Sequence, residues 1–280
     1  MTDEEILALL DQLEREAPPP NAVMSYGHEP QQFGHLRLPD AETAGPGPYP
    51  LVIVIHGGYW RARYDLGYFG AACGALARAG LATWNIEFRR IGDPGGGWPN
   101  TFEDVAAAAD FARTLAQPYP LDLSRVIALG HSAGGHLALW LAARPRLPAA
   151  SALWQADPLP IHGVVSLAGV ADLRRAWELG LSDNATDALL GGGPAQVPDR
   201  YATGSPFELL PLGVPQVLFH GTSDANVPFE ISQRYAERAQ ALGDDARLVA
   251  QEDASHFEPV DPATPEWRAV REALLALAGG

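Results

Sequence analysis

Three residues that together could hydrolyse a carbonyl compound follow one another along the chain: Ser132, Asp224 and His256. A serine hydroxyl becomes a strong nucleophile when a histidine accepts its proton, and an acid holds that histidine in the required tautomer. Each of the three residues follows a stretch typical of a buried strand. Parallel strands end at one edge of a sheet, so this order predicts a Ser–His–Asp triad at that edge.

The serine lies in the pentapeptide Gly130-His131-Ser132-Ala133-Gly134, which has the form G-x-S-x-G. A short apolar run precedes it, and apolar residues at helical spacing follow it. Glycines on both sides allow a strand and a helix to pass closely while the central residue takes a strained conformation. This pattern predicts a nucleophile elbow that exposes the serine hydroxyl.

The triad partners have simpler alternatives. Asp224 could cap a turn, and His256 could be a solvated loop histidine. Asp253 competes as the carboxylate but is expected in solvent, and His220 is expected to be a packed, hydrogen-bonded residue rather than the base. The three triad residues occur in order and each at a strand end, which favours the catalytic interpretation.

Backbone donors for the developing oxyanion are expected in His56-Gly57-Gly58-Tyr59-Trp60, directly after a β-branched run. Residues without a side chain leave room for N–H groups to line a cavity. The expected donors are the N–H groups of Gly58, Tyr59 and Ala133, with that of Gly57 as the adjacent alternative. His56 is expected to brace the loop. Tyr59 and Trp60 are either core aromatics or a substrate wall, and the second is favoured.

The composition excludes several other chemistries. All 19 basic residues are arginine, so Schiff-base chemistry, a Walker A loop and a Ser–Lys dyad are absent. The net charge of −15 argues against nucleic acid and anionic membranes as partners. Cys73 is the only cysteine and the histidines are scattered, so neither a metal nor a cofactor is expected. The acidic start and the lack of a long apolar run predict a cytoplasmic protein.

Strand and helix patterns alternate, as expected for a single α/β domain over residues 1–280 with a mainly parallel sheet and helices on both faces. Residues 1–20 should contain an amphipathic helix that packs on this domain or on a partner chain. Residues 172–211 break the alternation and are interpreted as a cap or lid, with Trp177 and Phe207 in the substrate pocket. The expected strands lie at 33–38, 51–55, 81–86, 126–129, 161–167, 214–219 and 246–250, and the other helices at 65–79, 101–117 with Thr101 as N-cap, 229–242 and 265–277.

These motifs resemble the α/β-hydrolase superfamily over nearly the whole chain. The His-Gly-Gly-Tyr-Trp segment is similar to the kynurenine formamidase-like (arylformamidase) and HGG-type carboxylesterase branch, in which Glu258 would be the acidic residue after His256-Phe257. The resemblance implies an α/β-hydrolase fold with a small cap and a metal-free serine hydrolase of small esters or N-formyl arylamides. A homodimer is possible.

Two other functions are alternatives for a chain with these residues. A prolyl-oligopeptidase-like peptidase would share the triad, but the chain has no room for a propeller-sized N-terminal domain. A non-hydrolytic or inactive binding protein would not need both a full triad and an oxyanion loop. The sequence does not distinguish an ester from a formamide as the substrate, because the cap is where such enzymes differ.

Overall fold

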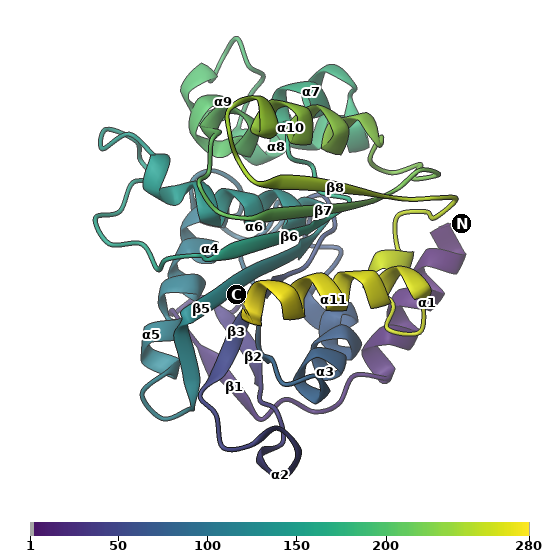
Figure 1. Cartoon of the computed structure of the whole chain (residues 1–280). Coiled ribbons are helices and arrows are strands. Elements are labelled where there is room, and N and C mark those ends of the chain that lie inside the picture. The colour runs from purple at the N-terminus through teal and green to yellow at the C-terminus, as the bar shows by residue number, and fades with distance from the viewer. Residues whose placement is uncertain (1–2, 280) are drawn as a thin grey trace.

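An eight-stranded sheet forms the centre of the protein, seen here in a computed structural model that describes residues 3–279. The strand order is β1-β2-β4-β3-β5-β6-β7-β8. Strands β1 and β2 pair antiparallel at one edge, and the strands from β4 to β8 are parallel (Figure 1). The strands are β1 (Ala22–Ser25), β2 (Phe33–Arg37), β3 (Tyr49–Ile55), β4 (Ala82–Ile86), β5 (Leu121–His131), β6 (Gly163–Leu167), β7 (Gln216–Gly221) and β8 (Ala246–Gln251).

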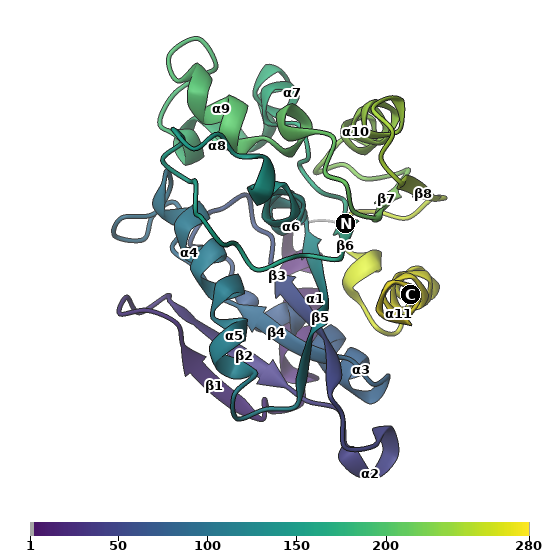
Figure 2. The same ribbon diagram turned by 60° about the vertical axis from the view of Figure 1, so that its left-hand side comes forward.

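Helices cover both faces of this sheet, which explains why the central strands are apolar on both sides. Every residue of β3 is buried, and its side chains alternate between two cores: Val52 and Val54 enter one, Ile53 and Ile55 the other. One face carries α1 (Asp3–Arg15), α3 (Gly70–Arg78) and α11 (Pro265–Gly279). The opposite face carries α4 (Asn100–Asp110), α5 (Ala112–Leu115), α6 (Ala133–Ala143) and α10 (Glu230–Ala241) (Figure 2).

The segment 172–211 forms a group of short helices that pack beside α6. The indole N–H of Trp140 donates to the carbonyl oxygen of Thr203 at 3.0 Å. Nε2 of His136 lies 2.8 Å from the carbonyl oxygen of Gly204. These bonds from a buried helix fix the insertion at the side of the sheet. Its elements are α7 (Leu173–Glu178), α8 (Leu181–Leu190), α9 (Pro198–Gly204) and the 3-10 helix η3 (Pro206–Leu209).

The predicted α/β-hydrolase fold class is confirmed, with three local differences. The short edge strand β1 was not predicted, because only alternate residues of its four are partly buried. The helix predicted at 65–79 begins as a 3-10 turn, η1 (Leu66–Phe69), before α3. The prediction of Thr101 as an N-cap was wrong: α4 begins at Asn100, and the Thr101 hydroxyl instead donates to the carbonyl oxygen of Arg89 at 2.6 Å.

Between residues 3 and 279 no helix is both long and apolar enough to cross a membrane.

Candidate active site

Ser132 lies in the sharp turn between β5 and α6. Its backbone has φ 57° and ψ −120°, a conformation that residues other than glycine rarely adopt. The turn needs its glycines: a Cβ on Gly134 would lie 2.0 Å from the carbonyl oxygen of Ile55, and a Cβ on Gly130 would lie 2.0 Å from that of Gly134. The Ser132 N–H is held by the carbonyl oxygen of Leu167 at 2.7 Å. The neighbouring strands therefore hold the serine in this strained position.

Asp224 and His256 meet beyond the ends of β7 and β8. Nδ1 of His256 donates to Oδ2 of Asp224 at 2.6 Å, and the Asp224 side chain is fully buried. Burial would raise the pKa of Asp224, but hydrogen bonds from His220, His256 and the Val227 N–H outweigh it and lower the pKa below its usual value. The carboxylate therefore stays ionised at neutral pH and holds a proton on Nδ1 of His256.

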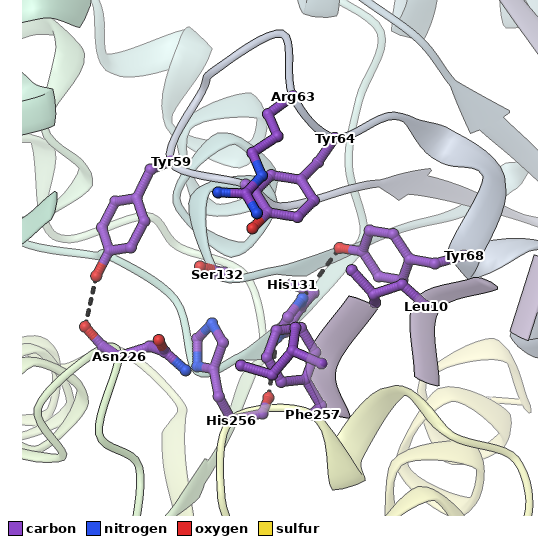
Figure 3. Close-up of a pocket in the computed structure, with 12 residues that line it drawn as sticks. Leu10, Tyr59, Arg63, Tyr64, Tyr68, His131, Ser132, Asn226, His256 and Phe257 are labelled. Atoms are coloured by element: carbon purple, nitrogen blue, oxygen red, sulfur yellow. Dashed lines mark hydrogen bonds between the residues drawn. The ribbon is translucent and has the colours of Figure 1, made fainter. Parts of the chain in front are cut away.

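His256 and Ser132 line the same cavity, and Figure 3 shows the His256 ring on the side of the cavity that faces the serine. Because Nδ1 carries the proton shared with Asp224, Nε2 is the nitrogen left to accept a proton. The structure thus brings together all three residues of the predicted triad. Ser132 and His256 line one cavity, and Asp224 is hydrogen-bonded to His256 on the buried side of the ring.

His220 has the structural position that the sequence indicated. Its Nε2 donates to the carbonyl oxygen of Val227 at 2.9 Å and lies 3.3 Å from Oδ2 of Asp224. In the tautomer with the proton on Nε2, Nδ1 accepts a hydrogen bond from the hydroxyl of Ser232 at 2.7 Å. With both nitrogens committed, His220 stabilises the Asp224 loop and is not available as a base.

The oxyanion loop offers fewer free donors than the sequence indicated. The Gly57 N–H donates to the hydroxyl of Tyr68 at 2.6 Å, so the alternative assignment of Gly57 as an oxyanion donor is wrong. Within residues 3–279, the N–H groups of Gly58, Tyr59 and Ala133 have no hydrogen-bond acceptor. That of Ala133 also lies at the positive end of the α6 dipole. These three remain the candidate donors.

A buried hydrogen-bond chain joins the oxyanion loop to the base. The Tyr68 hydroxyl accepts from Gly57 and lies 3.0 Å from Nδ1 of His131, to which it donates. Nε2 of His131 donates to the carbonyl oxygen of His256 at 2.9 Å (Figure 3). Burial, followed by the nearby His256, lowers the pKa of His131 well below its usual value, so the ring is neutral as this chain requires.

His56 braces the other side of the same loop. It is fully buried, and its Nε2 lies 3.0 Å from Oε1 of Glu87. Glu87 in turn accepts the N–H of Leu66 at 3.2 Å and pairs with Arg90. His56 does not line the cavity that contains Ser132. This arrangement suits the bracing role that the sequence indicated.

The cavity above Ser132 is small, at about 90 Å³. Tyr59 lines it, and its hydroxyl donates to the carbonyl oxygen of Asn226 at 2.5 Å, which connects the oxyanion loop to the Asp224 loop. Part of the apolar wall comes from Ile6 and Leu10 of α1. The residues lining the cavity are Ile6, Leu10, Gly58, Tyr59, Arg63, Tyr64, Tyr68, His131, Ser132, Asn226, His256 and Phe257.

Three residues predicted in the pocket lie elsewhere. Trp60 is buried and its indole N–H donates to Nδ1 of His136 at 3.2 Å, so it is a packing residue of the oxyanion loop. The Trp177 ring lies against Gly193 within the insertion, and Phe207 packs beside Arg234. No described residue of 172–211 lines the cavity, because the insertion is fixed against α6. The insertion therefore contributes no residue to this cavity, and its role as a cap stays a prediction.

Several residues of the cavity had no signal in the sequence. Ile6 and Leu10 were recognised as the apolar side of an amphipathic helix, but nothing in that pattern indicates which surface the helix covers. Arg63 and Tyr68 belong to a loop and a 3-10 turn without a motif. His131 occupies a variable position of the G-x-S-x-G pattern, and only its contacts show that it connects two parts of the site.

A sheet of this order, a serine at a strained strand-to-helix turn and an Asp–His pair at the next strand ends define an α/β-hydrolase-type protein. The comparisons with known proteins give the family. The model of the BD-FAE family matches residues 37–238. The chain therefore belongs to this family of α/β-hydrolase-type esterases.

Several curated relatives of the chain are named as esterases. The chain is 26% identical over 248 residues to a probable isoprenylcysteine alpha-carbonyl methylesterase from Arabidopsis thaliana, covering 83% of this chain and 50% of the relative. It is 28% identical over 230 residues to the esterase LipC of Mycobacterium tuberculosis, covering 78% and 54%. The chain thus spans about half the length of these relatives.

Solved structures share the fold. A truncated carbohydrate esterase from gut microbiota superposes with a TM-score of 0.79 at 21% identity, covering 95% of this chain and 98% of the other. An esterase from the Planctomycetes species Thermogutta terrifontis, with propionate bound, gives a TM-score of 0.73 at 21% identity, with 94% and 93% covered. At this identity the likeness concerns the fold alone.

Proposed function

We propose that the protein is a serine hydrolase that cleaves small carboxylic esters through an acyl-enzyme. The observation that carries the proposal is the 2.6 Å hydrogen bond from His256 to buried Asp224, with the His256 ring and Ser132 in one cavity. Esterases among the relatives support the same reaction class. The side chains of this triad supply nucleophile and base, so the proposed mechanism uses no metal or cofactor.

In the acylation step, Oγ of Ser132 attacks the ester carbonyl carbon while Nε2 of His256 takes the hydroxyl proton. The carbonyl π-electrons move to oxygen, and the N–H groups of Gly58, Tyr59 and Ala133 stabilise the resulting charge. Collapse of this intermediate breaks the bond to the leaving alcohol, which receives its proton from His256. Water, activated by the same nitrogen, then releases the acid and restores Ser132.

The size of the cavity favours a small acyl or alcohol group at the serine. Pockets that enclose drug-sized ligands usually measure roughly 300–1,000 Å³, whereas this cavity measures about 90 Å³. A long fatty chain or a folded peptide segment would have to lie largely outside it. We therefore favour small esters over the peptides of a prolyl-oligopeptidase-like enzyme.

A second candidate substrate is an N-formyl arylamide. The cavity accommodates a formyl group, and the His-Gly-Gly-Tyr-Trp segment resembles the formamidase-like branch. Esters and formamides would use the same triad, but the leaving arylamine needs protonation by His256 before it departs. Side-by-side turnover of p-nitrophenyl acetate and N-formylkynurenine decides between them. Turnover of the ester alone would exclude the formamidase proposal.

The proposed nucleophile is tested with Ser132→Ala and with a fluorophosphonate label. We expect kcat for p-nitrophenyl acetate to fall by roughly three orders of magnitude or more, because the triad acts as a unit. The matched control is Ser223→Ala, which removes an exposed hydroxyl from the neighbouring Asp224 loop. Near-normal turnover in Ser132→Ala, or labelling of another serine, would refute the mechanism and leave an inactive binding protein as the better proposal.

We also propose that the protein acts in the cytoplasm on small molecules, without nucleic acid or membrane partners. The net charge of −15 supports weak attraction to anionic polymers and surfaces. A homodimer remains a proposal. Light scattering at several protein concentrations measures it, and a constant mass near 29.9 kDa would exclude it.

A further inference from the structure

One formal positive charge lies on the wall of the cavity, and no carboxylate group accompanies it there. Arg63 belongs to the loop between the oxyanion segment and η1, and its side chain is labelled beside Tyr64 in Figure 3. The other lining residues are two histidines, His131 and His256, and residues whose side chains are apolar, aromatic or polar without a formal charge. Asp224 lies behind His256, fully buried, and does not line the cavity.

The two neighbouring arginines of this region have structural partners, and Arg63 does not. Arg61 donates to the carbonyl oxygen of Ser182 at 2.7 Å. Arg90 pairs with Asp93 at 3.1 Å and with Glu87. For Arg63, residues 3–279 provide neither an ion pair nor a hydrogen bond, although the chain contains 34 acidic residues. Its guanidinium group has another contact, the Tyr64 ring, at 5.5 Å from the centroid.

This contact leaves the guanidinium group suited to bind an anion. Packing over an aromatic ring uses the face of the group and limits its motion, while its N–H donors point outward along the edges. Those donors form a planar fork that matches the two oxygens of a carboxylate. An exposed arginine with this geometry at the wall of an active-site cavity is therefore a ready recognition group.

We propose that Arg63 binds a carboxylate group of the substrate, so that the enzyme prefers esters that carry a negative charge near the scissile bond. This inference rests on the proposed function and specifies its substrate class. The net charge of the whole protein acts in the opposite direction, since −15 repels anions. A preference for anionic esters therefore has to come from a local group, and Arg63 is the lining residue that supplies it.

The test compares esters that differ in one charge. On the alcohol side, 4-carboxyphenyl acetate is compared with 4-carbamoylphenyl acetate, which is nearly the same size and neutral. On the acyl side, monomethyl glutarate is compared with its monoamide. We expect kcat/KM to favour the carboxylate by about fivefold on one of the two sides, the size of an accessible charge-assisted contact. Added salt should reduce this ratio.

Variants assign the preference to Arg63. In Arg63→Gln the carboxylate-to-amide ratio should fall to about one or below, and Arg63→Lys should retain part of it, because a lysine keeps the charge and loses the fork. The matched control is Arg146→Gln, which removes an exposed, distant arginine and changes the net charge equally. Its ratio should equal that of the unchanged protein.

The possible results separate the two proposals. Equal rates for both members of each pair in the unchanged protein would overturn the role of Arg63, and so would an unchanged ratio in Arg63→Gln. Either result would leave the proposed hydrolase intact if Ser132→Ala still abolishes turnover. Turnover that survives Ser132→Ala would instead refute the proposed function itself.

Discussion

The buried hydroxyl of Tyr68 provides a sharp test of how the site is held together. It accepts the Gly57 N–H at 2.6 Å and donates to Nδ1 of His131 at 3.0 Å. Tyr68→Phe removes one oxygen atom and preserves the ring that packs against Phe69. The substitution therefore breaks the connection between the oxyanion loop and the base with little change in packing.

The expected magnitude follows from the groups left without partners. Gly57 N–H and His131 Nδ1 are both buried, and each unsatisfied group costs about 1–3 kcal/mol. We expect the free energy of unfolding to fall by roughly 2–6 kcal/mol. A displacement of about 1 Å in a catalytic group costs up to about 100-fold in rate. We therefore expect kcat for p-nitrophenyl acetate to fall roughly 10- to 100-fold, with a smaller change in KM.

The assay needs a control that loses a buried tyrosine hydroxyl outside the site. Tyr235 provides it, since its hydroxyl donates to Oε1 of Gln216 at 2.7 Å in the core. Tyr235→Phe should lower the free energy of unfolding by about 1–3 kcal/mol and leave kcat unchanged. Both variants are assayed at a temperature where circular dichroism shows them folded. A Tyr68→Phe variant with normal kcat would refute the positioning role.

Three further predictions concern the triad, the elbow and the buried histidines. Asp224→Asn should lower kcat by about 10³- to 10⁴-fold, measured with p-nitrophenyl acetate, because His256 loses the group that fixes its tautomer. Gly134→Ala should prevent folding, seen as a loss of the soluble protein, because the new Cβ would lie 2.0 Å from the carbonyl oxygen of Ile55. Burial lowers the pKa of His136 to about 4, from about 6.5 in the unfolded chain. The unfolded state then binds more protons, so this contribution to stability is complete above pH 6.5 and is lost as the pH is lowered. The free energy of unfolding should therefore decrease between pH 7 and pH 5, and His136→Gln should make that decrease smaller by about 2 kcal/mol in urea titrations.

Each of these has a result that would contradict it. The pKa of Asp224 is lowered, so its carboxylate should not titrate across the assay range; an unchanged kcat in Asp224→Asn would show that another group orients His256. The control for Gly134→Ala is Gly279→Ala, where the new Cβ meets no atom within 4 Å. If both glycine variants fold alike, the elbow has more room than the structure gives it. Equal pH dependence with and without His136 would contradict the linkage argument.

The fold could be predicted because its signals are local and repeated. Buried strands such as β3 are continuous apolar runs, and G-x-S-x-G follows from backbone sterics that Gly130 and Gly134 alone satisfy in this turn. The partners of Ser132 could be named because each follows a strand, and parallel strands end together. The edge strand β1 had no such signal, since four half-buried residues give little alternation.

The pocket could not be predicted, because it depends on contacts between distant segments. The sequence shows that α1 has an apolar side, but not that Ile6 and Leu10 would lie beside a serine more than one hundred residues later. Trp60 lies only two residues after Gly58, yet it has a positive φ of 57° and its ring is buried in the core beside His136. The sequence also does not show which backbone N–H groups are free: that of Gly57 is not, because the Tyr68 hydroxyl in another element accepts it.

Because α1 contributes to the pocket, the wall of the pocket and the proposed catalytic groups lie on different parts of the chain. A substitution can therefore change one without the other. The proposed triad and oxyanion donors follow β3, β5, β7 and β8, whereas part of the apolar wall comes from α1, which precedes all of these strands in the chain. Leu13 anchors that helix in the core, while Ile6 and Leu10 reach the cavity. For the proposed hydrolase, a library that varies only the two cavity-facing positions of α1 would therefore change which esters enter and leave the proposed catalytic groups unchanged. Under that proposal, substrate range is a property to be redesigned from α1.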